Sequence, residues 1–225
     1  MIDFEKVAYG YGGDALFSDV SITLSPGSFH FLTGPSGAGK TTFIRLCYGA
    51  LHPVTGQIRI FGDDVCGMNR DAIASLRRRI GVVHQNEQFL EHLPLKENVA
   101  LPLRVAGSDG QFQKDDLQEL ISWVGLTERA HALPAELSGG ERQRAALARA
   151  VIRSPDIVLA DEPTGNVDWE MSKRLLHLLI ELNRMGKTVL IATHDLALIR
   201  AAKVHVQARV LRIAQGRIQL AGADL

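Results

Sequence analysis

The chain has 225 residues, of which 46% are hydrophobic and 22% are charged, a composition typical of a soluble globular protein with one full core. Lysine plus arginine equals aspartate plus glutamate at 25 each, which argues against a broad electrostatic footprint for nucleic acid or an anionic membrane. No apolar run approaches the roughly 18 residues that span a bilayer, and the charged N-terminal stretch does not resemble a signal peptide. Any work at a membrane would therefore need a partner.

The first part of the chain alternates between predicted strands and predicted helices. Alternating or short apolar runs, separated by turn residues, predict strands over 2–8, 20–24, 28–34, 57–61 and 80–85. Helices are predicted at 41–50 and 71–79. The second of these ends in Arg77, Arg78 and Arg79, the densest basic cluster, which we interpret as a solvated helix face rather than a binding patch.

Residues 86–135 differ in character, because polar segments and prolines surround a single amphipathic stretch. One apolar helix face is expected there, with the i, i+3, i+4, i+7 spacing of Leu117, Leu120, Ile121 and Val124. We interpret about 86–155 as a helical lobe inserted into a core made of 1–85 and 156–225.

The last part of the chain predicts buried strands between helices. Continuous apolar runs at 156–161 and 187–195 are typical of a parallel sheet that is covered on both faces. Helices are predicted over 138–154 and 168–185, and residues 208–220 predict a hairpin that turns at Gln215 and Gly216. The pattern as a whole is α/β, with an antiparallel margin.

The strongest chemical signal is GPSGAGKT, residues 34–41, which fits the pattern G-x-x-x-x-G-K-[ST] between a predicted strand and a predicted helix. Its glycines let successive backbone N–H groups curl around phosphates. Lys40 offers a positive charge to the β and γ oxygens, and the Thr41 hydroxyl is a ligand for Mg²⁺. The alternative, an ordinary glycine-rich turn, does not require this full motif.

Two consecutive carboxylates, Asp161 and Glu162, end an apolar run that predicts a buried strand. A buried, unpaired carboxylate costs several kcal/mol, so the pair needs a cation or a catalytic task. Asp161 fits the Mg²⁺ partner of a phosphate-binding loop, and Glu162 is then placed to act as general base toward the attacking water. The alternative of a helix N-cap suits either residue alone better than both.

Two further polar residues stand at the carboxyl ends of predicted strands, where ligands of open α/β sheets collect. His194 follows the run that starts at 187 and could hydrogen-bond the γ-phosphate, although a lone histidine is more often a structural core residue. Gln85 ends the strand 80–85 and could reach the metal or the water, although by itself a glutamine is uninformative.

The stretch ELSGGERQRAALARA, residues 136–150, predicts a second helix N-terminus suited to phosphate. Ser138 is a natural N-cap, and Glu141 completes a capping box. Gly139 and Gly140 are costly in a first helical turn, but they would let a ligand approach the backbone at the positive end of the helix dipole.

In combination and in order, these motifs resemble the nucleotide-binding subunits of ABC ATPases over essentially the whole chain. The Walker A motif is 34–41, the signature is LSGGERQ, Walker B ends at Asp161 and Glu162, and the D-loop is GNVD at 165–168. The resemblance implies a P-loop NTPase of ABC-type architecture, with a mixed core sheet, an antiparallel β margin and an inserted helical lobe in one domain over 1–225.

The resemblance also implies a role for each site residue. The implied catalytic residues are Glu162, His194 and Gln85, and the implied Mg²⁺ ligands are Thr41, Gln85 and Asp161. The implied ATP-binding residues are Tyr11, Gly34, Pro35, Ser36, Gly37, Ala38, Gly39, Lys40, Thr41, Thr42, Ser138, Gly139, Gly140 and Asp168. Tyr9 rivals Tyr11 as the aromatic residue that stacks on adenine. In the family two copies close head to tail, so the signature helix of one copy covers the γ-phosphate held by the other.

Within the family, the sequence looks most like the ATPases of cell division, which resemble those of lipoprotein release and macrolide export. The first reading implies an FtsX-like integral membrane subunit, an ATP-bound homodimer, and a cytoplasmic location on the inner face of the bacterial inner membrane. Phe89, Leu90 and Leu93 are candidate contacts to that subunit, with lobe core as the equal alternative. The less favoured reading, a soluble nucleic-acid ATPase of repair or translation, would require long coiled coils or a second nucleotide domain, and the sequence has neither.

Overall fold

The computed structural model describes residues 1–107 and 112–221 as two sheets with helices on either side of the larger one. The larger sheet has the order β10-β9-β3-β8-β7-β6, and all its pairs are parallel except the β9–β10 hairpin. Its strands are β3 (Phe29–Thr33), β6 (Ile80–Val83), β7 (Ile157–Asp161), β8 (Thr188–Ala192), β9 (Ala208–Ala214) and β10 (Arg217–Leu220). This is the mixed core sheet that the resemblance implied.

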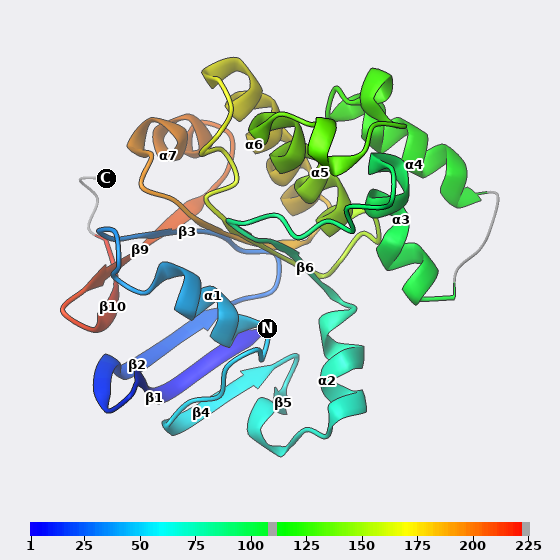
Figure 1. Cartoon of the computed structure of the whole chain (residues 1–225). Coiled ribbons are helices and arrows are strands. Elements are labelled where there is room, and N and C mark those ends of the chain that lie inside the picture. Colours follow the sequence, from blue (N-terminus) through cyan, green and yellow to red (C-terminus); the bar gives the residue numbers. More distant parts are fainter. Residues whose placement is uncertain (108–111, 222–225) are drawn as a thin grey trace.

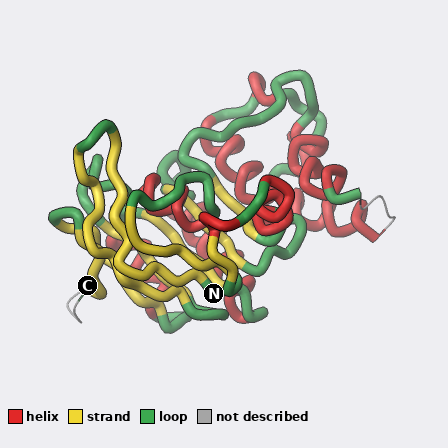
Figure 2. Tube along the Cα trace, turned by 90° about the horizontal axis from the view of Figure 1, so that it is seen from below, coloured by secondary structure: helices red, strands yellow, loops and turns green. Residues whose placement is uncertain are grey.

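The smaller sheet is the predicted antiparallel margin. Its order is β2-β1-β4-β5, with strands β1 (Ile2–Tyr11), β2 (Asp14–Leu24), β4 (Thr55–Ile60) and β5 (Asp63–Asp64). Buried and exposed residues tend to alternate along β2 and β4, because one face of this sheet packs on the core while the other faces solvent. Figure 2 shows the strands gathered toward one side of the molecule.

The helices divide between the two faces of the larger sheet (Figure 1). They are α1 (Lys40–Cys47), α2 (Arg70–Arg77), α3 (Leu95–Val105), α4 (Phe112–Trp123), α5 (Gly139–Val151), α6 (Trp169–Arg184) and α7 (Leu196–Lys203). Short 3-10 turns add Val65–Gly67, Thr127–Arg129 and Pro134–Glu136. Helix α1 lies between the two sheets, and α5, α6 and α7 cover the opposite face, where α3 and α4 join α5 in a lobe.

The central strands separate two hydrophobic cores. Every residue of β3, β7 and β8 is buried, and successive side chains of β7 point to opposite faces. Ile157 and Leu159 pack with α1 and the smaller sheet, whereas Val158 and Ala160 pack with the helices α5, α6 and α7. Burial on both faces is why these strands read as continuous apolar runs, and it holds the loops at their carboxyl ends in fixed positions.

The predicted apolar helix face of the lobe is confirmed, because Ile121 and Val124 are buried and Leu117 and Leu120 pack against the same core. In α6, Leu175, Leu179 and Leu182 are buried, and Leu178 packs beside them. Of the three residues proposed to contact a membrane subunit, Phe89 is buried and belongs to the core, Leu90 is 43% exposed, and Leu93 is half-buried.

Several predicted boundaries shift. Strand β6 ends at Val83, so Gln85 lies in the loop that follows rather than at the strand end. Helix α5 ends at Val151 and α1 at Cys47, each three residues before the predicted end. Helix α7 was not predicted at all: Leu198, Ile199 and Ala202 bury its one apolar stripe, but eight residues are too few for a clear helical period.

Candidate active site

The loop between β3 and α1 leaves the N-terminus of α1 open to a ligand. Gly39 is the N-cap with a φ of 101°, no side chain caps the helix, and the first turn holds no acidic residue. A Cβ on Gly39 would lie 2.8 Å from the ring of Phe17, so glycine is required for packing as well as for the backbone conformation. The unpaired amide groups and the helix dipole together favour an anion here.

Lys40 folds back over this loop. Its Nζ donates hydrogen bonds to the carbonyl oxygens of Gly34, at 3.0 Å, and Pro35, at 3.3 Å, and lies 4.0 Å from Glu162 Oε1. The ammonium group is thus held above the open helix N-terminus. Both features present positive charge to the same place, as a phosphate site requires.

Asp161 occupies the last position of β7, beside α1. It is 3% exposed, and the Thr41 hydroxyl donates a hydrogen bond of 2.5 Å to its Oδ2. Burial raises the pKa of this carboxyl, and the hydrogen bond from Thr41 only partly offsets the effect. A buried carboxylate against a hydroxyl is a pair of oxygen ligands that suits Mg²⁺, which usually takes one or two protein ligands and completes its shell with phosphate and water.

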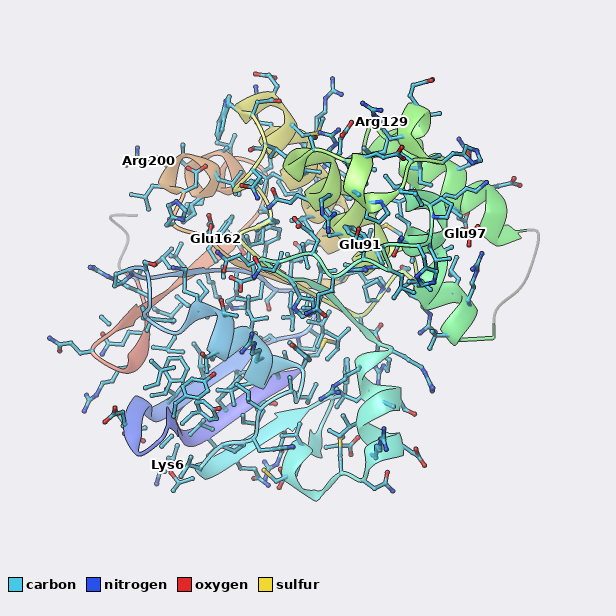
Figure 3. The ribbon with its side chains drawn as sticks, in the orientation of Figure 1. Lys6, Glu91, Glu97, Arg129, Glu162 and Arg200 are labelled. Carbon is cyan, nitrogen blue, oxygen red and sulfur yellow. The ribbon has the colours of Figure 1, made fainter. Side chains whose placement is uncertain are left out.

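Glu162 follows with a backbone φ of 50°, in the left-handed region that a side chain rarely adopts. Its amide donates to Ala192 O at 2.9 Å, and its Oε1 lies 2.9 Å from His194 Nδ1. Strained backbone of this kind persists only where the surroundings hold it, and it clusters at functional sites. Figure 3 labels Glu162 between α1 and the helices on the other face of the sheet.

These residues surround one pocket of about 760 Å³. It is lined by Tyr11, Leu16, Gly34, Pro35, Ser36, Gly37, Gly39, Lys40, Thr41, Thr42, Gln85, Gln143, Asp161, Glu162, Gly165, Asn166 and His194. Tyr11 lies at the edge of this pocket and is half exposed. Its hydroxyl lies 3.3 Å from Thr42 Oγ1, and this hydrogen bond lowers the pKa of Tyr11. Tyr9 packs edge-on against Tyr11 and lies outside the pocket lining, so of the two tyrosines it is Tyr11 that borders the pocket.

Four predicted residues belong elsewhere in the fold. Ser138, Gly139 and Gly140, at the start of α5, are not among the residues that line the pocket, and neither is Asp168. Asp168 is the N-cap of α6, with its side chain accepting from Met171 N at 2.9 Å. Ala38 also lies outside the lining, with its amide donating to Pro35 O within the loop.

The capping box of α5 forms as predicted. Ser138 Oγ accepts from Glu141 N at 3.3 Å, and Glu141 Oε2 accepts from Ser138 N at 2.8 Å. Those backbone and side-chain hydrogen bonds, with Arg129 at 3.0 Å, lower the pKa of Glu141. The second glycine has a further reason: a Cβ on Gly140 would lie 2.9 Å from Asn166 O, whereas one on Gly139 would meet nothing nearer than 3.9 Å.

Sequence reasoning missed four residues that line the pocket: Leu16, Gln143, Gly165 and Asn166. The last two belong to the D-loop motif and could have been included with it. Gln143 is the last residue of the signature LSGGERQ and could have been included with that motif; it is also a polar residue on the otherwise buried face of α5, among Ala145, Ala146 and Leu147.

Comparison with known proteins places this geometry in a family. The family model described as ABC transporter matches residues 17–165, from β2 through Walker A and the signature to the D-loop. The chain belongs to the ABC transporter family. The fold class and the ATPase class predicted from sequence are thereby confirmed.

Relatives of this ABC ATPase include cell-division proteins. The "Cell division ATP-binding protein FtsE" of Escherichia coli (strain K12) is 42% identical over 200 residues, which cover 88% of this chain and 90% of the relative. FtsE of Bacillus subtilis (strain 168) is 41% identical over 208 residues, covering 92% and 91%. A solved dimer of the ATP-binding cassette MJ0796, in a post-hydrolysis state bound to ADP and Pi, superposes with a TM-score of 0.87 at 29% identity and 97% coverage of both chains.

Within residues 1–107 and 112–221 of the ABC ATPase, no helix is long and apolar enough to cross a membrane. The same residues contain no cluster of three or more histidine, cysteine or acidic side chains suited to hold a metal by themselves. A metal at Thr41 and Asp161 would therefore depend on oxygens from a nucleotide and from water.

Proposed function

We propose that this ABC ATPase closes as a homodimer around ATP and drives an FtsX-like integral membrane subunit in bacterial cell division. One observation carries the dimer: within residues 1–107 and 112–221, the N-termini of α1 and α5 both suit phosphate, and of these two only that of α1 opens into the pocket. A second copy, turned head to tail, would bring its own Ser138, Gly139 and Gly140 over the γ-phosphate. The dimeric cassette MJ0796 supports this arrangement.

Each pocket residue then has a task toward the nucleotide. The open amides of α1 and the Lys40 ammonium bind the β- and γ-phosphates, and Tyr11 offers a ring face to adenine. Thr41 and Asp161, with Gln85 from the adjoining loop, would hold Mg²⁺. When bound, that ion would neutralise charge on the phosphate oxygens. The ion would also stabilise the charged form of Asp161, whose pKa burial raises.

Hydrolysis needs a water held in line with the γ-phosphate. The Glu162 carboxylate would accept a proton from that water as its oxygen attacks phosphorus and the bond to the β-phosphate oxygen breaks. His194, 2.9 Å from Glu162 Oε1 and 77% exposed at its side chain, fixes this carboxylate and can reach the γ-phosphate. Loss of the γ-phosphate removes the ligand shared by both copies, so the dimer opens.

The membrane subunit is proposed to dock in a second groove, of about 510 Å³, between α2, β6, α3 and α5. Its lining includes Arg77, Arg78, Arg149 and Arg153 and the apolar Leu101, Pro102 and Val105; none of the lining residues in the described ranges is acidic. This charge suits a segment of the membrane subunit that carries acidic and apolar side chains. The proposal therefore assigns Arg77 and Arg78, interpreted from sequence as part of a solvated helix face, to binding. The protein would thus sit on the cytoplasmic face of the inner membrane and pass its ATP cycle through that subunit to peptidoglycan hydrolases.

The experiment that tests the ATP-driven dimer is Glu162→Gln. The variant should bind ATP, lose about 10³-fold in hydrolysis, and elute as a dimer with ATP and Mg²⁺, because closure no longer ends in cleavage. Glu181→Gln, at an exposed ion pair with Arg184, is the matched control and should behave as the wild type. A Glu162→Gln protein that stays monomeric with ATP, or hydrolyses it at the wild-type rate, would disprove the proposal.

The membrane partner is tested by charge reversal. Arg78→Glu should lose co-purification with the FtsX-like subunit while ATP binding stays within about twofold of wild type. Arg200→Glu is the control and should co-purify normally, because Arg200 is not among the residues that line the groove and lies on α7, across the molecule from α2 and α3 (Figures 1 and 3). Equal co-purification of both variants would argue against docking in this groove.

A further inference from the structure

Gln143 lies on α5 at the junction between the signature and the catalytic carboxylate of the same chain. Its side chain is 4% exposed and lines the ATP pocket. Its Nε2 donates a hydrogen bond of 2.5 Å to Glu162 O, and its Oε1 accepts one of 3.0 Å from Asn166 N. Both ends of one buried amide are therefore used to join α5 to the loop that follows β7.

The hydrogen bond from Gln143 to Glu162 O stabilises a strained backbone conformation at Glu162. Glu162 has a φ of 50°, and among the described residues its carbonyl oxygen accepts one further hydrogen bond, from Gly165 N at 3.2 Å. A left-handed conformation at a residue with a side chain costs of order 1–3 kcal/mol and persists where neighbours over-determine it. Rotation of this backbone would redirect the carboxylate that contacts His194 at 2.9 Å.

The other end of the connection is the signature itself. Gln143 lies five residues after the N-cap Ser138, about 7.5 Å along the helix axis. Between them, Gly140 packs so closely on the D-loop that a Cβ there would lie 2.9 Å from Asn166 O and 3.3 Å from Val167 Cγ1. The first turns of α5 and residues 165–167 therefore leave no gap in which one could move without displacing the other.

We infer that Gln143 is a positioning residue that couples the two ATP sites of the dimer. When the start of α5 closes on the ATP held by the other copy, Gln143 carries that displacement to Glu162 O and Asn166 N and sets the Glu162 carboxylate for hydrolysis in its own site. Each site then hydrolyses ATP efficiently only when the opposite site is filled. The inference rests on the proposed dimer, and it assigns the link to one side chain.

Gln143→Met tests the coupling, because methionine keeps the length and shape and removes both hydrogen bonds. We expect kcat to fall about tenfold, KM for ATP to stay within about threefold, and the Hill coefficient for ATP to fall below that of the wild type, to the value that closure of the dimer alone produces. Gln57→Met is the matched control: Gln57, on β4 and far along the other sheet, donates to Asp64 Oδ2 at 2.8 Å. A wild-type kcat and Hill coefficient in Gln143→Met, or equal losses in both variants, would overturn the inference.

Gln143→Glu adds a readout that a purely structural role would not change. The introduced carboxylate can still accept from Asn166 N, but it donates to Glu162 O only when protonated. The ratio of its kcat to that of the wild type should therefore rise as the pH is lowered. A ratio that is independent of pH contradicts the inference. Should Gln143→Met fail to fold, this variant tests the same bond alone.

The dimer is checked separately with Glu162→Gln and with the double variant Glu162→Gln, Gln143→Met. Both should elute as dimers with ATP, because Gln143 is proposed to act on hydrolysis and not on closure. If Glu162→Gln itself stays monomeric, the proposed function fails. If it dimerises while Gln143→Met keeps the kcat and Hill coefficient of the wild type, only the coupling role fails.

Discussion

The helices α1 and α5 begin in opposite ways, although both N-termini suit phosphate. Helix α1 starts at Gly39 with no side-chain cap and no acidic residue in its first turn, under the Lys40 ammonium. Helix α5 starts at Ser138 with both halves of a capping box formed, and its Glu141 is paired with Arg129 at 3.0 Å. The first terminus has no side-chain cap and leaves its amides to a ligand, whereas the capping box of the second already engages the amides of Ser138 and Glu141 within its own chain.

In the proposed dimer, this difference would separate two steps: binding of ATP by a single copy at α1, and closure of a second copy at α5. An uncapped N-terminus beside a lysine is ready to bind nucleotide in a single copy. A capped terminus gains less from the same anion, because the Glu141 carboxylate already interacts with the positive end of its dipole. In the proposed dimer it would contribute only when a second copy brings phosphate and excludes water, and weak binding there would keep closure reversible.

Lys40→Ala should break the first terminus with the largest effect. Removing a charge-assisted phosphate contact is expected to weaken ATP binding to the monomer about 100-fold. Isothermal titration with ATP measures the change, and Lys173→Ala, at the ion pair with Glu170 on α6, is the control. An affinity within threefold of wild type would contradict the assignment of Lys40.

Ser138→Arg should break the second terminus and leave the first intact. The bulk and charge of arginine at an exposed N-cap block closure, so we expect ATP binding by the monomer to be unchanged and ATPase activity to fall more than about tenfold. Sizing in ATP and a steady-state assay provide the measurement. Ser138→Ala, which removes only the cap, should lose less, and full activity in Ser138→Arg would rule out closure through this helix.

Gly140→Ala and Gly139→Ala compare two neighbouring glycines in the first turn of α5, of which only Gly140 packs closely on the D-loop. A Cβ at 140 meets Asn166 O at 2.9 Å, so the first variant should lower the free energy of unfolding by about 1–3 kcal/mol. A Cβ at 139 has free space to 3.9 Å, and its effect should stay within about 0.5 kcal/mol. Urea denaturation measures both, and equal values would show that the D-loop yields to the added methyl group.

Asp161→Asn changes the carboxylate that contacts Thr41 in the first turn of α1, and it should have the smallest effect. Here the quantity measured is the free energy of unfolding. Burial raises the pKa of Asp161 in the folded state, so the folded protein holds this proton more tightly than the unfolded chain. Stability of the nucleotide-free wild type therefore falls as pH rises from the unfolded pKa to the folded one. Asparagine carries no ionisable group, so the variant does not lose this stability. Its free energy of unfolding should be about 1 kcal/mol higher than that of the wild type at neutral pH, and the difference should disappear in acid.

Local sequence patterns predicted most of the elements and much of the pocket. Asp161 ends β7, Glu162 follows it and His194 follows β8. The carboxyl ends of parallel strands share one edge of a sheet, so the meeting of these side chains could be expected. Helix α7 was missed because eight residues show little periodicity. Gln85 was assigned to the end of a strand, but pairing of β6 with β7 ends at Val83, which leaves Gln85 on a loop.

The sequence by itself determined the phosphate loop, the adjacent carboxylates and the capping box, because each depends on residues that are neighbours along the chain. Only the tertiary structure decided that α5 and the D-loop interlock through Gly140 and Gln143, since these contacts join residues 19 to 26 positions apart. It also decided that Tyr11, rather than Tyr9, borders the pocket. The local sequence pattern does not distinguish Tyr9 from Tyr11, or Gly139 from Gly140. Tertiary packing distinguishes them, because the close approach of two backbone segments depends on the whole fold.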